Sequence, residues 1–163
     1  MTILPDDPLG SGGIAVFAEA LRAGKTSAKK AVRAYLDRIE ALEPKLNAYQ
    51  FVAYEQAEEA AEAIDKLLAS GIDLGPLMGV PIAIKDIYAV ENMPTTNGSL
   101  YDASEITGPE GRYVTALKQS GCIILGKTKT VEYALGATGV NEARGTPWLS
   151  LIHISEPTRR YFI

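Results

Sequence analysis

The first half of the chain carries apolar residues at helical spacing. Three segments, residues 14–23, 26–44 and 54–70, place apolar side chains three or four positions apart with polar ones between them. Thr26 or Ser27 can cap the second segment, and Pro44 is expected just past its end. Gly24 and Gly71 follow the other two. The pattern therefore predicts three amphipathic helices before residue 72.

The second half alternates between apolar runs and polar turns. Residues 75–88, "GPLMGVPIAIKDIY", read as a turn followed by a buried strand that contains one lysine, and residues 122–125, "CIIL", read as a second buried strand. A short extended piece is expected at 47–52. Residues 91–100 read as a loop, 110–121 as a helix, and a short helix is expected to begin near Thr128. Helices that alternate with strands predict an α/β layered fold.

Composition narrows the class of protein. The 163 residues are 47% hydrophobic and 22% charged, with a net charge of −4, which is typical of one soluble globular domain and does not favour a nucleic-acid partner. The first twelve residues lack a signal-peptide pattern, and no run predicts a membrane helix. The single cysteine, Cys122, lies in an apolar run, where we expect a buried thiol. We therefore expect a cytoplasmic protein with a flexible arm at residues 1–12 and no membrane partner.

One stretch matches a nucleotide-binding motif letter for letter. In "SGCIILGKTKT", Gly121, Gly126, Lys127 and Thr128 fit the phosphate-loop spacing G-x-x-x-x-G-K-[ST]. A phosphate loop needs an open turn whose N–H groups face the phosphates, whereas the residues between these glycines form an apolar, β-branched run. The strand should precede the first glycine, and here it lies inside the motif. We interpret the match as accidental and place Gly126–Thr128 in a strand-to-helix turn.

The only histidine, His153, lies in a foreign-looking tail. Residues 149–159 resemble the translation of a transposase mosaic end and sequencing adapter. We therefore interpret residues 149–163 as an artefact, and expect the natural protein to continue differently after Trp148. If His153 is foreign to the protein, a histidine-based catalytic triad is excluded. We expect neither a metal nor a cofactor.

The segments "GPLMGVPIAIKD" and "GCIILGKTKTVEYALG", with "MPTTNGS" between them and "TGVNEARGTPW" after them, resemble the amidase signature family of serine hydrolases. The resemblance implies that residues 13–148 form the N-terminal part of a single amidase domain, a truncated α/β/α fold with a mixed central sheet. It also implies hydrolysis of a carbon–nitrogen bond other than a peptide bond, in a small-molecule amide, by a Ser-Ser-Lys triad.

The family's lysine falls on Lys85, in the segment G-V-P-x-x-x-K-D. Lys85 stands in an apolar strand, and burial would favour its neutral form by lowering its pKa, so that it could act as a base. The family's two serines lie in a G-G-S-S-x-G segment that would follow Trp148. The resemblance thus implies that this chain holds the base and lacks both serines, so we expect it to be inactive.

The loop after the predicted strand supplies the candidate substrate-binding residues Thr96, Gly98 and Ser99, although turn formation alone could explain them. Ser99 is not the family's nucleophile. Asp86 is expected to bond to nearby backbone or to the lysine loop. Two alternatives stay open: the A subunit of a tRNA-dependent amidotransferase, and a non-enzymatic homologue. The substrate is not specified by the sequence, and a homo-oligomer of the intact protein stays open.

Overall fold

A computed structural model describes residues 7–10, 12–136 and 138–148. The tail at 149–163 and most of the expected N-terminal arm lie outside the described residues. The first helix, α1, spans Gly13–Arg22, directly after the position where the arm was expected to end. Among the described residues, no helix is long and apolar enough to cross a membrane.

The three predicted N-terminal helices are present. The helix α2 spans Ala28–Leu46, and the hydroxyl oxygen of Ser27 accepts a hydrogen bond from the Lys30 N–H (3.0 Å), so Ser27 is its cap. The expectation that the helix ends before Pro44 is wrong, because Pro44 lies inside the last turn and Asn47 ends the helix with a left-handed backbone (φ 48°). The helix α3 spans Tyr54–Ala69.

Three strands form a mixed sheet in the order β1-β3-β2. The strand β1 (Tyr49–Val52) pairs antiparallel with β3 (Ile123–Thr128), and β2 (Pro81–Lys85) pairs parallel with β3. The expected α/β class and mixed sheet are confirmed. The central strand β3 runs three residues beyond the predicted Leu125, and a 3₁₀ turn, η1 (Glu132–Ala134), stands where the helix was expected to begin.

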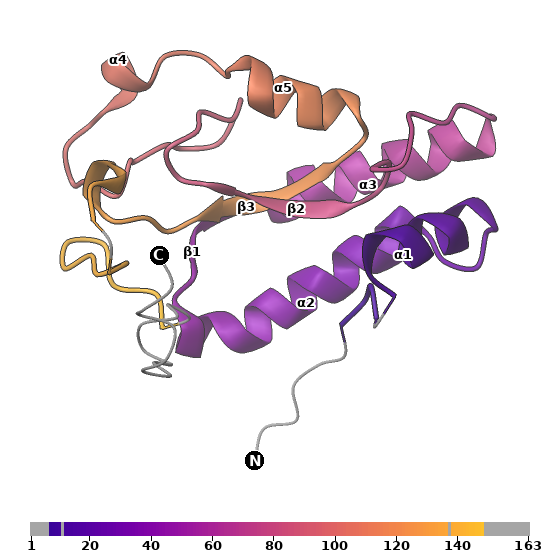
Figure 1. The fold of residues 1–163 in the computed structure, drawn as a ribbon, viewed down its shortest axis with the longest axis horizontal. Helices are drawn as coiled ribbons and strands as arrows, with labels where there is room; N and C mark the ends of the chain where they lie inside the picture. The colour runs from indigo at the N-terminus through magenta and orange to yellow at the C-terminus, as the bar shows by residue number, and fades with distance from the viewer. Residues whose placement is uncertain (1–6, 11, 137, 149–163) are drawn as a thin grey trace, which may run out of the picture.

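Helices cover both faces of the sheet (Figure 1). On one side, Ile123 and Leu125 of β3 pack with α1, α2 and α3 in the larger core. On the other side, Ile84 and Ile124 pack against Val114 of α5 (Arg112–Gln119) in a smaller core. The short helix α4 (Ser104–Thr107), which the sequence pattern does not predict, lies in the connection between β2 and α5.

A bulge in β3 changes which side chains face the smaller core. Ile82 pairs with Ile124, but Ala83 pairs with Gly126, so one residue of β3 is left out of the register. The extra residue shifts the alternation, and Lys127 pairs with Ile84 and shares its face. Without this bulge, Lys127 would lie on the opposite face of the sheet.

Gly126 is required at the bulge. Its φ is +154°, and a Cβ there would lie 2.2 Å from the carbonyl oxygen of Phe51 on β1. We predict that Gly126→Ala lowers the free energy of unfolding by about 3 kcal/mol, because it combines an unfavourable backbone conformation with a steric clash. Urea denaturation would measure the change. Gly111→Ala is the control, since nothing lies within 4 Å of a Cβ at Gly111, and an equal loss in both variants would contradict the explanation.

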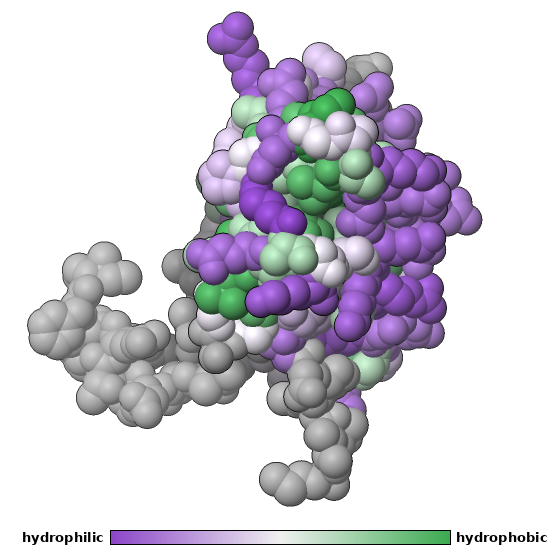
Figure 2. Space-filling view, turned by 90° about the vertical axis from the view of Figure 1, so that its right-hand side faces the viewer, coloured by the Kyte–Doolittle hydropathy of each residue, from purple (hydrophilic) through white to green (hydrophobic). Residues whose placement is uncertain are grey.

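A hollow at the α1 end of the molecule is unrelated to the predicted site. Figure 2 shows apolar side chains among polar ones on this side. The hollow, of about 610 Å³, lies between α1 and the end of α3, where Arg22 and Asp73 form an ion pair of 2.7 Å. None of the sequence-predicted site residues lines it.

Candidate active site

Lys85 is the last residue of β2, and its side chain is exposed. The expectation of a buried lysine is therefore wrong for the described part of the chain. Lys85 pairs with Thr128 of β3, and Ala83, two residues earlier on the same face of β2, is also exposed. The Lys85 ammonium group is thus accessible at the carboxyl end of a strand.

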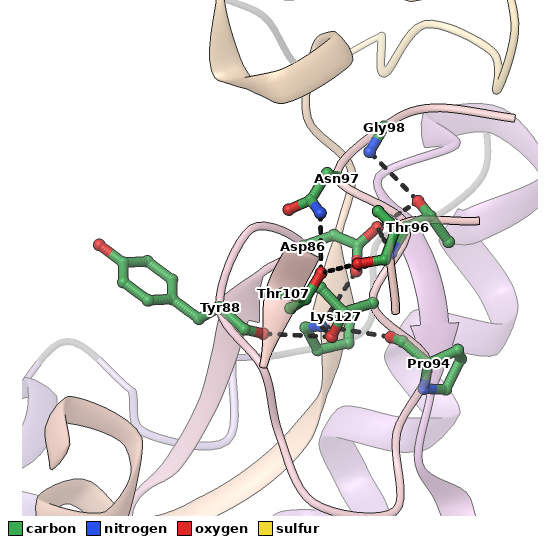
Figure 3. Close-up of polar contacts among 10 residues, drawn as sticks. Asp86, Tyr88, Pro94, Thr96, Asn97, Gly98, Thr107 and Lys127 are labelled. Atoms are coloured by element: carbon green, nitrogen blue, oxygen red, sulfur yellow. Dashed lines mark hydrogen bonds and ion pairs between the residues drawn. The ribbon is translucent and has the colours of Figure 1, made fainter. Parts of the chain in front are cut away.

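Asp86, the next residue, is completely buried and heavily bonded (Figure 3). Its carboxylate accepts hydrogen bonds from the backbone N–H of Thr96 (3.2 Å) and from the Thr96 hydroxyl (2.5 Å), and forms an ion pair with Lys127 (3.0 Å). The expectation that Asp86 bonds to the neighbouring loop is confirmed. Asp86 therefore ties the end of β2 to the loop that follows and to the next strand.

Lys127 is the buried lysine of this region. Its side chain is fully buried, and its ammonium group donates to Asp86, to the Thr95 hydroxyl (2.8 Å) and to the Pro94 carbonyl oxygen (3.2 Å). Burial lowers the pKa of Lys127, and the bond to Asp86 opposes that lowering. Sequence reasoning missed this role because it placed Lys127 in a turn. The apolar run before Lys127 did not indicate its burial, because the bulge in β3 decides which face Lys127 takes.

The loop residues predicted to bind substrate are engaged within the protein. Thr96 donates its hydroxyl to Asp86, and Ser99 is buried and donates its hydroxyl to Glu132 (2.7 Å). Gly98 is also buried, and a Cβ there would lie 2.7 Å from the Thr130 carbonyl oxygen. The structure thus gives all three residues a role in shaping the loop. Substrate contact by them stays a prediction.

Two residues that sequence reasoning did not single out hold the loop from the other side. Asn141 is buried and donates from its side chain to the carbonyl oxygens of Gly98 (2.7 Å) and Thr130 (2.9 Å). The Arg144 guanidinium group donates to the carbonyl oxygen of Ser99 (2.9 Å). Asparagine is common in turns, so the sequence does not distinguish an asparagine that bonds to a distant loop from one that forms a turn.

The match to a phosphate loop is accidental, as predicted. Cys122, Ile123, Ile124 and Leu125 are buried, and the last three lie in β3, so no open cradle exists between Gly121 and Gly126. The lysine of the pattern, Lys127, is buried and bonded to Asp86. In the described part of the chain, no group of three or more His, Cys, Asp or Glu side chains is arranged to hold a metal ion.

The fold and this site define an α/β protein with an exposed lysine at a strand end that Asp86 anchors to β3. Comparison with known proteins gives its family. The family model described as "Amidase" matches residues 30–148. The chain therefore belongs to the amidase family, and its structural neighbours include a bacterial aryl acylamidase of the amidase signature enzymes.

Several relatives extend this result. The chain is 40% identical over 135 residues to the A subunit of the glutamyl-tRNA(Gln) amidotransferase of Acidothermus cellulolyticus, covering 81% of this chain and 27% of that protein. It is 45% identical over 106 residues to a 2-amino-5-chloromuconic acid deaminase of Comamonas testosteroni, covering 65% of this chain and 23% of that protein. The peptide amidase of Stenotrophomonas maltophilia superposes with a TM-score of 0.75 at 27% identity, over 86% of this chain and 30% of its own.

These matches also show what share of its relatives' length the chain covers. It spans about a quarter of the length of the curated relatives it matches. The matched part contains Lys85, the buried pair of Asp86 and Lys127, and the loop at 96–99.

Proposed function

We propose that this chain supplies the lysine base of an amidase that hydrolyses the carbon–nitrogen bond of a small-molecule amide other than a peptide. The observation that carries the proposal is the position of Lys85, exposed at the end of β2 while its neighbour Asp86 is anchored in the protein. Membership of the amidase family supports the reaction class.

In the proposed reaction, the Lys85 amine accepts a proton from a first serine. That serine takes the proton of a second serine, whose oxygen attacks the amide carbonyl carbon. The carbon–nitrogen bond breaks as the leaving nitrogen takes the proton of the first serine, which recovers a proton from Lys85, and an acyl-enzyme remains. Water then adds to the acyl carbon and releases the acid and the serine.

Both serines are expected after Trp148, and the chain as printed is therefore expected to be inactive. The experiment is to read the source DNA across the codons for Pro147 to Leu149 with an adapter-free, long-read method. A frame that continues into a glycine- and serine-rich segment supports the proposal and the artefactual origin of residues 149–163. A frame that encodes the printed tail and then stops would refute both, and would leave a non-enzymatic homologue.

The complete protein can then be assayed for ammonia release from a panel of small amides. We expect turnover by the complete protein and none by the 163-residue chain at the same concentration. The same proposal puts the enzyme in the cytoplasm, with no nucleic-acid or membrane partner, and leaves a homo-oligomer open. Cell fractionation and sizing of the complete protein test these points.

A second function has a specific observation in its favour. The 40% identity to the A subunit of an amidotransferase supports glutamine as the amide and a heteromeric complex as the working form. The predicted signature is ammonia release from glutamine only when partner subunits are present. Turnover of other amides by the isolated complete protein would decide for the first function.

A further inference from the structure

We propose that Lys127 positions the base Lys85 by acting through Asp86. This inference rests on the proposed function, because it assumes that Lys85 is the base. Lys127 is buried, and its ammonium group donates to three acceptors within the protein. We therefore assign it a positioning role and not proton exchange with a substrate.

Two bonds to β3 hold the end of β2. Lys85 and Asp86 are consecutive, so their side chains point to opposite faces of the sheet. The N–H of Asp86 donates to the Thr128 carbonyl oxygen (2.9 Å), and its carboxylate bonds to Lys127, so β3 holds Asp86 at two points. Any rotation of the strand end that moves Lys85 must break one of these bonds.

Asp86 and Lys127 also hold the loop beside the end of β2 (Figure 3). Asp86 binds the N–H and hydroxyl of Thr96, and its carbonyl oxygen accepts from the N–H of Asn97 (3.0 Å). Lys127 reaches the same loop through Pro94 and Thr95. The pair therefore fixes both Lys85 and the loop that holds the predicted substrate-binding residues.

Asp86 and Lys127 are both fully buried, which bears on what the pair contributes. A buried ion pair costs desolvation energy that an apolar pair of similar volume avoids, so such a pair is weak evidence for stability as such. It does specify geometry, because three acceptors from the end of β2 and the loop converge on one ammonium group. A misplacement of about 1 Å at a reacting group can cost about 100-fold in rate, so this geometry bears directly on catalysis.

The test uses the complete enzyme defined above, with Lys127→Met, Asp86→Asn and the double variant. We expect kcat per folded molecule to fall about 10- to 100-fold in each single variant, with KM changed less than about three-fold. In the double variant, we expect the unfolding midpoint to recover toward that of the parent while kcat stays low. Recovery of kcat together with stability would mean that the pair is merely structural, and would overturn the proposal.

A milder variant covers the case in which these proteins do not fold. Thr95→Val removes one hydrogen bond to Lys127, and kcat is expected to fall about three- to ten-fold. Thr115→Val is the matched control. Thr115 lies on α5, and its hydroxyl donates to Glu110 and not to Asp86 or Lys127. Equal kcat in both variants would contradict the proposal. Absence of turnover in the unmutated complete enzyme would instead refute the proposed function.

Discussion

Lys127→Ala is expected to lower the free energy of unfolding of this chain by about 3–5 kcal/mol, because it leaves the Asp86 carboxylate buried without its cation. Asp86 and Lys127 are both fully buried, so water cannot replace the lost partner without opening the loop at 94–97. Urea denaturation followed by circular dichroism would measure the loss, with the slope compared between variants.

The control for this stability prediction is Lys85→Ala. Lys85 lies one residue from Asp86 in the sequence and is exposed, so its loss is expected to change the free energy of unfolding by less than about 0.5 kcal/mol. Equal destabilisation by the two substitutions would show that burial of Lys127 does not determine the effect. Partial recovery in Lys127→Ala combined with Asp86→Asn is also expected, because the uncompensated charge is removed.

Lys85→Met in the complete enzyme is expected to reduce kcat at least about 100-fold with little change in stability. The reason is that a positioned general base contributes about 100- to 10,000-fold, and methionine keeps the length of the side chain but accepts no proton. Steady-state ammonia release, with the unfolding midpoint measured in parallel, would give both quantities.

The matched control for the kinetic prediction is Lys66→Met, since Lys66 is a largely exposed lysine on α3 that forms an i,i+4 pair with Glu62. Its kcat is expected to stay within about two-fold of the parent. A Lys85→Met enzyme that keeps more than about a tenth of the parental kcat would remove Lys85 from the role of base.

The helices and strands could be predicted from the sequence because their patterns are local. Spacing of apolar residues located α1, α2 and α3, and β-branched runs located β2 and β3. The end of α2 was missed because proline is usually excluded from a helix after its first turn, whereas Pro44 lies inside the last turn and Asn47 ends the helix with a left-handed backbone. The extent of β3 was missed because the bulge at Gly126 interrupts the alternation from which a strand is recognised.

The burial of the two lysines could not be predicted in the same way. Lys85 and Lys127 both stand close to apolar strand residues, and the local pattern treats them alike. The bulge places Lys127 on the face that α5 and the loop at 94–97 cover, whereas Lys85 lies on the opposite face at the end of β2, where its side chain is exposed. Only the pairing of β2 with β3 decides this, and that pairing cannot be read from either segment alone.

The same limit applies to the loop at 96–99. Its composition predicted a turn, and its place after a strand that carries a lysine predicted a site. The bonds from Asn141 and Arg144 join it to a segment more than forty residues away in the chain. Contacts between residues so far apart in the sequence depend on the tertiary fold. The sequence pattern could therefore predict the loop, but not the hydrogen bonds from Asn141 and Arg144 that hold it.

The central claim is that Lys85 activates a serine that attacks an amide. The most direct measurement is covalent labelling of the complete enzyme by a fluorophosphonate probe, followed by mass spectrometry of the labelled peptide. We expect rapid labelling of one serine after residue 148, and we expect Lys85→Met to lower the rate of labelling at least about 100-fold. Labelling at an unchanged rate in Lys85→Met, or no labelled serine in the active enzyme, would contradict it.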